Sequence, residues 1–254
     1  DVFTSIEKHV GKFFKSQQLR QLMEFPVLFL GALPKDTPAL YSLMNYADIK
    51  LGTWYPKKGM YEVVEGMYKL ALELGVKFFF DHDVIAIDIE EGKAKSVTAN
   101  TSVSEKKVSN ISFDADVVIA SADYHFIETK VLPVNCRTYS DKYWDKRLMA
   151  PSCLLYYIGL NKKIEGVPHH SLFFDADFEL HGAEIYKTKK WPADPLFYLS
   201  VSSVTDETVA PTGCDNMVFL IPVASGLEAD TEELRNSYFE KILTRFENKT
   251  GQSI

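Results

Sequence analysis

Small residues gather at the end of one apolar run, and this is a place where a ligand could approach the backbone. Ala120, Ser121, Ala122 and Asp123 stand at the end of the run over residues 117–120, which is predicted to be a short buried strand. Ligands of open α/β sheets collect at the carboxyl ends of strands. Ala120, Ser121 and Ala122 are therefore candidates for contact with a cofactor, and a tight turn is the alternative interpretation.

No other set of residues has the spacing of a familiar catalytic or metal-binding motif. Gly52, Gly59 and Gly66 are too widely spaced for the GxGxxG turn that binds a dinucleotide pyrophosphate. The three cysteines form no CxxC pair, so we expect no zinc site. His169 and His170 have no carboxylate close in sequence, which favours a structural role over a metal site. No Ser-His-Asp arrangement is evident.

The composition restricts the class of protein. Hydrophobic residues make up 46% of the 254 residues, enough for a sizeable core in one large domain or two modest ones. The net charge of −7 argues against a nucleic-acid partner bound through its phosphates. No apolar run approaches the roughly 18 residues of a membrane span, and no secretory signal pattern is present. Together with the dispersed cysteines, this predicts a reduced, cytoplasmic protein.

The clearest secondary-structure pattern lies between residues 54 and 89. Over Met60–Leu74 apolar residues recur at i, i+3, i+4 and i+7, which predicts an amphipathic helix, and Gly75 suits its C-cap. Val76–Phe80 is an apolar run with the length of a buried strand, and Asp83–Ile89 alternates with the period of a second strand. A helix and two strands in this order indicate a layered α/β domain.

The character of the sequence changes at Tyr124. Before it, we expect a helix over residues 1–24 and two strands, over 94–99 and 111–115, separated by an exposed loop. After it, the patterns predict an α+β arrangement, a mixed or antiparallel sheet with helices on one side. The expected strands are 148–160, 171–174, 196–203 and 217–223, and the expected helices are 126–132, 177–186 and 230–248.

Five stretches form an ordered set: LRQLMEFPVLFLGALPKDTPALYSLMNY, GTWYPKKGMYEVVEGMYKLALELGVKFFFDHDVIAI, ADVVIASADYHFIETKVLP, VPHHSLFF and DPLFYLSVSSVTDETVAPTGCDNMVFLIPV. Together they resemble the carotenoid (phytoene) desaturase family of amine-oxidase-like flavoproteins, from about Leu19 to Phe246. The resemblance implies an enzyme that uses FAD to remove hydrogens from a long polyene. The alternatives are an isoprenoid saturase or isomerase, another amine-oxidase-like oxidoreductase, and a non-catalytic lipid-binding module.

Two signatures of that family do not occur in this chain: the N-terminal strand–GxGxxG–helix and a C-terminal glycine-rich segment. The resemblance therefore implies an internal fragment. Residues 59–123 would form the inner part of an FAD/NAD(P)-binding lobe, and residues 1–58 and 124–254 the substrate-binding domain. We expect the chain alone to bind FAD weakly or not at all and to be inactive, because pyrophosphate contacts dominate flavin affinity in this fold.

The resemblance also implies positions for the cofactor. The backbone at Val84, directly after Asp83, matches a position that meets the adenine ring, and a core valine is the alternative. The pentapeptide PKKGM matches a Pro-x-Gly-Gly-Met pattern near the isoalloxazine, which makes Lys58, Gly59 and Met60 candidates. Lys58 replaces the first glycine of that pattern. Its charge could stabilise a reduced, anionic flavin, or it could lie free in solvent.

Arg20 matches a family arginine near the reaction centre and is the catalytic candidate, with a solvent-exposed cation as the alternative. Relatives often have an acidic residue a few positions earlier, where this chain has Ser16, Gln17 and Gln18. The absence of an acidic residue at these positions weighs against acid–base catalysis by this segment.

A polyene substrate needs an apolar wall, because pockets for apolar ligands are mostly hydrophobic. The candidates for such a tunnel are Phe25, Phe29, Leu30, Leu33, Tyr41, Trp54 and Tyr55, and ordinary core packing is the alternative. The expected partners are a hydrophobic isoprenoid and a membrane surface, contacted through Val27–Leu33 and the lysines of residues 8–15. An exposed sheet edge makes a homo-oligomer a further expectation.

Overall fold

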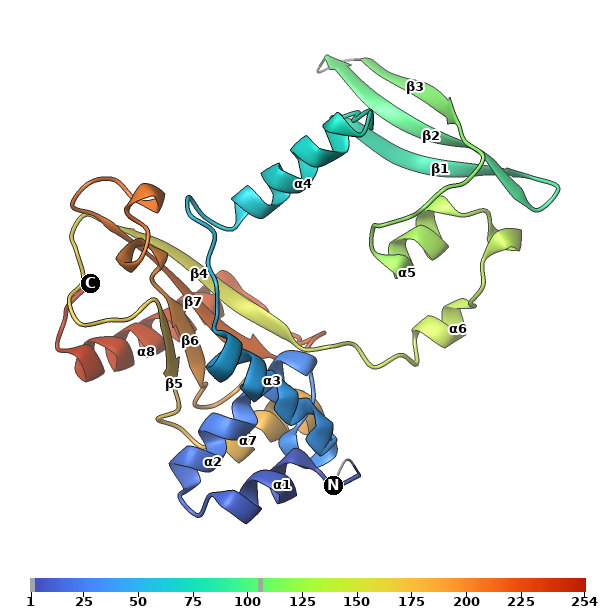
Figure 1. Ribbon diagram of the computed structural model, residues 1–254. Coiled ribbons are helices and arrows are strands. Elements are labelled where there is room, and N and C mark those ends of the chain that lie inside the picture. Colours follow the sequence, from blue (N-terminus) through green and yellow to red (C-terminus); the bar gives the residue numbers. More distant parts are fainter. Residues whose placement is uncertain (1–2, 105–106) are drawn as a thin grey trace. The chain divides into compact units, whose positions relative to one another are not determined.

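The computed structural model describes residues 3–104 and 107–254, and the chain divides into two compact units (Figure 1). Unit 1 combines residues 1–68 with residues 149–254, and unit 2 comprises residues 69–148. The sequence placed the corresponding boundaries after residues 58 and 123, so both lie further along the chain than expected. The assignment of the two parts to substrate and cofactor binding stays a prediction.

Unit 1 contains a four-stranded antiparallel sheet with the strand order β4-β7-β6-β5 (Figure 1). The strands are β4 (Ser152–Leu160), β5 (His170–Phe173), β6 (Phe197–Ser200) and β7 (Asp215–Val223). They fall in the four segments that the sequence marked by their β-branched and aromatic residues. The predicted combination of an antiparallel sheet with helices is therefore confirmed.

Helix α8 (Glu232–Thr250) covers one face of this sheet. Its buried residues Tyr238, Ile242 and Phe246 pack with the buried, alternate residues of β7 in one core. The helix begins two residues after the predicted position 230, because the Thr231 side chain caps it by accepting a hydrogen bond from the Leu234 amide. The Asp230 carboxylate pairs with Arg235.

The remaining helices of unit 1 are short. The predicted helix over residues 1–24 is two helices, because Phe14 has an extended backbone and Ser16 begins a new helix. Gly31, with φ +75°, ends the 3-10 helix that follows them. These elements are α1 (Ile6–Phe13), α2 (Gln17–Glu24), the 3-10 helix η1 (Phe25–Leu30), α3 (Leu43–Tyr46) continued by a π turn (Ala47–Leu51), and α7 (Phe178–Ala183) continued by a π turn (Glu184–Thr188). Single 3-10 turns occur at Pro34–Asp36, Ala39–Ser42, Ser202–Val204 and Glu207–Val209.

Unit 2 contains an antiparallel meander of β1 (His82–Glu90), β2 (Lys93–Ser104) and β3 (Lys107–Asp114). Glu91 and Gly92, with φ of 50° and 75°, form the predicted turn between β1 and β2. The expected loop over residues 100–110 was wrong for residues 100–104 and 107–110, which β2 and β3 occupy as paired strands, and its residues 105–106 lie outside the described part of the structure. The other helical elements are α5 (Tyr124–Phe126) with a π turn (Ile127–Val131), a 3-10 turn (Val134–Cys136) and α6 (Asp141–Trp144).

Helix α4 (Tyr61–Glu73) forms where the sequence predicts it, but its apolar face is exposed, with Met67 62% and Leu70 57% accessible. The two predicted buried strands over residues 76–80 and 117–120 are absent, and Ile119 is 87% exposed. A β-strand is defined by hydrogen bonds to a neighbour. Neither segment pairs with a strand among the residues that the structure describes, so the apolar run alone does not produce one.

Candidate functional site

An apolar cavity lies against the face of the unit 1 sheet opposite α8. Its volume is about 380 Å³, within the range of sites for small molecules. One wall is the sheet, and the others are η1 and α7 with its π turn. Its lining includes Phe25, Leu28, Leu30, Cys153, Phe174, Phe178, His181, Ile185, Tyr186, Leu196, Tyr198, Leu220 and Pro222.

Successive side chains of β7 point to opposite faces of the sheet, which explains why the sheet borders both the core and the cavity. Met217, Phe219 and Ile221 are buried beneath α8. Leu220 and Pro222 point to the other face and line the cavity. A single strand therefore supplies both surfaces.

The polar atoms of His181 and Tyr186 in the cavity wall are bonded to the backbone. Nδ1 of His181 accepts a hydrogen bond from the Leu196 amide at 3.0 Å, so Nε2 carries the proton and donates to the Pro222 carbonyl at 3.0 Å. Burial lowers the pKa of His181, which favours this neutral form. The Tyr186 hydroxyl donates to the Leu28 carbonyl, and burial raises its pKa to about 12. These two side chains complete an apolar wall and offer no group for proton transfer.

Only some of the predicted tunnel residues meet at this cavity. Phe25 and Leu30 line it. Leu33 is buried behind the cavity. Its side chain lies so close to Gly182 that a Cβ atom added at Gly182 would come within 2.7 Å of Leu33. The side chain of Phe29 lies outside the described part of the structure.

The other three tunnel candidates lie elsewhere on unit 1. Tyr41 and Trp54 are 43% and 87% exposed. Tyr55 packs edge-on against His169, with the ring centres 4.7 Å apart. Tyr55 thus belongs to a second, polar pocket of about 670 Å³. That pocket is lined by Thr53, Tyr55, Lys57, His169, His170 and residues 205–208.

The polar pocket adjoins the predicted flavin turn over residues 56–60. Lys58 and Gly59 have φ of 74° and 103°, and Lys58 and Met60 are exposed. The Lys58 amide donates a hydrogen bond of 2.5 Å to Oδ2 of Asp206, which lines the pocket. A turn with two left-handed residues needs such support, because side chains other than glycine disfavour this conformation.

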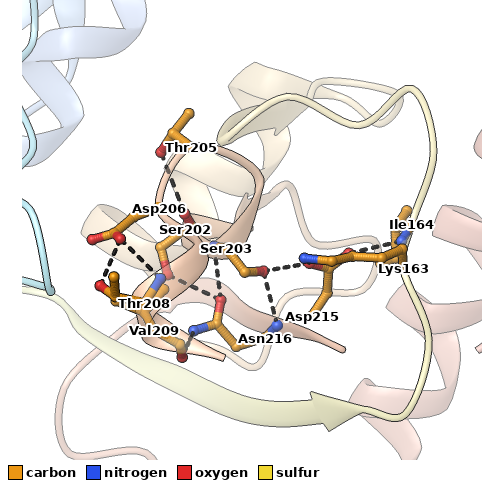
Figure 2. A network of polar contacts seen from close by, with 10 residues as sticks. All are labelled: Lys163, Ile164, Ser202, Ser203, Thr205, Asp206, Thr208, Val209, Asp215 and Asn216. Carbon is orange, nitrogen blue, oxygen red and sulfur yellow. Dashed lines mark hydrogen bonds and ion pairs between the residues drawn. The ribbon is translucent and has the colours of Figure 1, made fainter. Parts of the chain in front are cut away.

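A buried polar network begins at Asp215, the first residue of β7 (Figure 2). Its carboxylate accepts hydrogen bonds from Lys163 Nζ at 2.9 Å, the Ile164 amide at 2.7 Å and the Ser203 hydroxyl at 2.7 Å. Burial alone would raise the pKa of Asp215, but these three donors outweigh it and lower the pKa. Asp215 is therefore a carboxylate in the folded protein, and in this form it binds the loop through Ser203.

Asn216 extends this network to the rest of the loop (Figure 2). Its side-chain oxygen accepts from the Ser202 hydroxyl and the Ser203 amide, at 2.9 and 3.2 Å. Its side-chain nitrogen donates to the Val209 carbonyl at 3.1 Å. Both ends of the loop that carries Asp206 are thus attached to the start of β7.

His169 and His170 stack with ring centres 4.1 Å apart. Nδ1 of His169 lies 2.6 Å from the Thr205 hydroxyl, and Nδ1 of His170 lies 2.5 Å from the Tyr198 hydroxyl. Burial and the neighbouring His170 lower the pKa of His169. No cluster of three metal-ligating side chains occurs among residues 3–104 and 107–254.

Arg20, the catalytic candidate, does not line either pocket. Its guanidinium lies 3.6 Å from the carboxylate of Glu24, which is only 5% exposed. Burial raises the pKa of Glu24, while Arg20 acts in the opposite direction. An acidic partner was expected before Arg20 in the sequence, but the partner follows it, at the i, i+4 spacing that pairs side chains on a helix.

The remaining cofactor candidates belong to unit 2. Asp83 and Val84 lie on β1, an edge strand of its sheet, where Val84 pairs with Ala99 of β2. The register shifts directly after Val84, which is 39% exposed. Residues 120–122 form an exposed, irregular segment rather than the end of a strand. Their roles in cofactor binding stay predictions.

Comparison with known proteins gives a consistent result. The sequence model of the family described as flavin containing amine oxidoreductase matches residues 4–153. A carotenoid 3,4-desaturase from Haloarcula japonica is 37% identical over 97% of this chain and 48% of its own length. A phytoene desaturase from Phycomyces blakesleeanus is 30% identical over 87% of this chain and 37% of its own length. The chain thus spans about half or less of the curated relatives that it matches.

A crystal structure of an oxidoreductase from Methanosarcina mazei has a similar fold. Its TM-score is 0.64 at 14% sequence identity, and the match covers 98% of this chain and 53% of that one. Within the described residues, no helix is long and apolar enough to cross a membrane.

Proposed function

The chain belongs to the flavin-containing amine oxidoreductase family, and from this premise we propose that its parent protein is an FAD-dependent desaturase of a carotenoid precursor such as phytoene. In this proposal, unit 1 binds the substrate and carries the turn that supports the flavin. The predicted cofactor contacts at Val84 and residues 120–122 lie in unit 2.

The observation that carries the proposal is an apolar cavity next to a polar pocket within unit 1. Tyr198 joins the two, since it lines the cavity while its hydroxyl lies 2.5 Å from His170 of the pocket. A desaturase has this requirement: it must hold an unreactive hydrocarbon beside a polar, redox-active cofactor and keep water away. The relatives named as desaturases support the same assignment.

The residues present fit a flavin. Gly59, with φ 103°, allows a turn that other residues disfavour, and Lys58 offers an exposed cation beside it. β1 is an edge strand, so its outer backbone edge is unpaired within the described residues. The chemistry that FAD supplies when bound is the removal of hydrogens from a carbon–carbon bond.

The chain's own residues then have three tasks. The cavity lining binds the hydrocarbon through dispersion and the hydrophobic effect, and it excludes water. Lys58 offers positive charge to a reduced, anionic flavin. Arg20 pairs with Glu24 within α2 and lines neither pocket, so a catalytic role for it needs the test given below.

Peripheral membrane contact is part of the proposal, because a carotenoid precursor dissolves in lipid. In the segment that the sequence favoured, Val27–Leu33, only Leu30 among the described side chains is well exposed, at 45%, while Val27 and Leu33 are 1% and 5% exposed. A better surface is the apolar patch of residues 40–54. Its exposed members are Leu40, Leu43, Tyr46, Ile49, Leu51 and Trp54.

The full-length parent protein tests the function directly. It is purified, its flavin content is measured by visible absorption, and it is incubated with phytoene in liposomes. We expect bound FAD and the longer-wavelength absorption of newly conjugated double bonds. A protein that binds FAD and reduces double bonds would be a saturase. A protein that binds phytoene without FAD would be a lipid-binding module, which the same cavity would also suit.

A further inference from the structure

Lys58 has a backbone conformation that lysine disfavours. Its φ of 74° lies in the left-handed region, and Gly59 follows with φ 103°. Glycine adopts this region at little cost, whereas a side chain with a Cβ does not. Some contact must therefore hold Lys58 in this state.

That contact comes from Asp206, far away in the sequence. Oδ2 of Asp206 accepts the Lys58 amide at 2.5 Å. Oδ1 accepts the Thr208 amide at 3.0 Å and the Thr208 hydroxyl at 2.6 Å. Asp206 is only 6% exposed, and both of its oxygens have partners. Its carboxylate is therefore fixed in orientation when it meets the Lys58 amide.

The position of Asp206 is determined in turn by the buried network at the start of β7 (Figure 2). Asp215 holds Ser203, and Asn216 holds Ser202 and Val209, on either side of Asp206. Hydrogen bonds thus link the start of β7 to the loop that carries Asp206, and Asp206 to the 56–60 turn. The turn is supported by the core of unit 1 and not only by its own sequence.

We propose that Asp206 is a positioning residue that holds Lys58 in the left-handed conformation required for flavin binding, and so compensates for the absence of glycine at position 58. The inference rests on the proposed function, because it assigns the purpose of the turn to flavin binding. Asp206 acts through the Lys58 backbone and not on the flavin itself.

The test compares four forms of the full-length parent protein: wild type, D206A, K58G and the double variant D206A/K58G. Flavin dissociation constants are measured by fluorescence quenching, and hydrogen exchange of the Lys58 amide is followed in wild type and D206A. We expect D206A to bind FAD about tenfold more weakly, since a left-handed lysine without its partner is disfavoured by roughly this factor. The Lys58 amide should also exchange faster.

The K58G background separates positioning from general support of the fold. Glycine adopts the left-handed region without help, so D206A/K58G should bind FAD within about twofold of K58G. A merely structural role of Asp206, such as capping the turn at Thr208, would weaken binding equally in both backgrounds. D230A is the matched control, because it removes an aspartate of unit 1 whose partner is Arg235. D206L, whose side chain has a similar shape but no acceptor, takes the place of D206A if that variant does not fold.

Equal FAD affinity in wild type and D206A, or an undiminished loss in the K58G background, would overturn the inference. A wild-type protein that binds no FAD would instead refute the proposed function. The exchange rate of the Lys58 amide would then still report whether Asp206 holds the turn.

Discussion

The Tyr198 hydroxyl lies 2.5 Å from Nδ1 of His170, and this contact forms part of the boundary between the apolar cavity and the polar pocket. The two residues are diagonal neighbours on the same face of adjacent strands, since His170 of β5 pairs with Ser200, two positions after Tyr198 of β6. A side chain with an apolar ring and a polar tip suits such a boundary.

Replacing Tyr198 separates the two functions of its side chain. Y198F should lower the free energy of unfolding by about 0.5–1.5 kcal/mol, because one hydrogen bond is lost while the ring remains. Y198A should in addition weaken binding of an apolar fluorescent probe to the cavity, because its wall is opened. Urea denaturation and probe titration measure both effects. Y157F, on an exposed tyrosine of β4, is the control. Unchanged probe binding in Y198A would contradict this role.

Stability should depend on the protonation of His181. Burial lowers its pKa in the folded state, so its contribution is complete above the unfolded pKa of about 6.5 and is lost as the pH falls below that value. Each histidine of this kind contributes a slope of at most about 1.4 kcal/mol per pH unit. His169, whose pKa is also lowered, should add to the same decline.

Urea denaturation at pH 7.5 and pH 5.5 measures this effect. In H181N the amide oxygen can replace Nδ1 as acceptor of the Leu196 amide, and the side chain does not titrate. This variant should be less stable at pH 7.5 but should lose less stability on acidification. An identical pH dependence in wild type and H181N would show that His181 is not responsible.

Blocking the cavity should reduce substrate conversion without unfolding the protein. Cys153 is exposed and lines the cavity from β4, so C153W places a large side chain in it with little strain in the core. We expect at least a tenfold lower rate of phytoene conversion by the full-length protein, with an unchanged melting temperature. Tyr157 lies on the same strand outside the cavity lining, so the Y157W protein should convert phytoene at the wild-type rate. Full activity of C153W would place the substrate elsewhere.

The pair of Arg20 and Glu24 allows structural and catalytic roles to be distinguished. R20A leaves the buried Glu24 carboxylate without its cation, and it should cost about 1–2 kcal/mol at pH 7.5, a range reduced for the partial exposure of Arg20. The loss should shrink near pH 4.5, because Glu24, whose pKa is raised, is then protonated.

The double variant R20A/E24Q should recover this stability. If Arg20 is catalytic, the rate of phytoene conversion stays low even though stability returns. Recovery of both would show that Arg20 only stabilises α2.

Membrane contact should depend on the apolar patch of residues 40–54. Glutamate at Ile49 or Trp54, which are 69% and 87% exposed, should reduce flotation of the full-length protein with anionic liposomes at least fivefold. V204E, on an exposed valine outside the patch, is the control. Flotation that is unaffected by I49E and W54E would exclude this surface.

The sequence correctly predicted the helices and strands whose periodic apolar residues pack against another element of the chain. β7 and α8 are such a pair: the period of two in one and of 3.6 in the other bury Phe219 against Phe246. The helical pattern of α4 was equally clear, but its exposed Met67 shows that a pattern determines the helix and not its burial. The run Val76–Phe80 failed as a strand because strand formation depends on hydrogen bonds to another segment.

The site depended more strongly on tertiary structure. The sequence marked Phe25, Trp54 and Tyr55 alike as tunnel residues, and only folding assigned them to a cavity, the solvent and a polar pocket. It also singled out Lys58 as a departure from a glycine pattern, which is a local property of the chain. That Asp206 holds the Lys58 amide could not be foreseen, because 148 residues separate the two and only the packed loop after β6 brings them within 2.5 Å. The local sequence thus determined that position 58 departs from a glycine pattern. The long-range hydrogen bond from the Lys58 amide to Asp206, which only the folded chain forms, decided what supports this position.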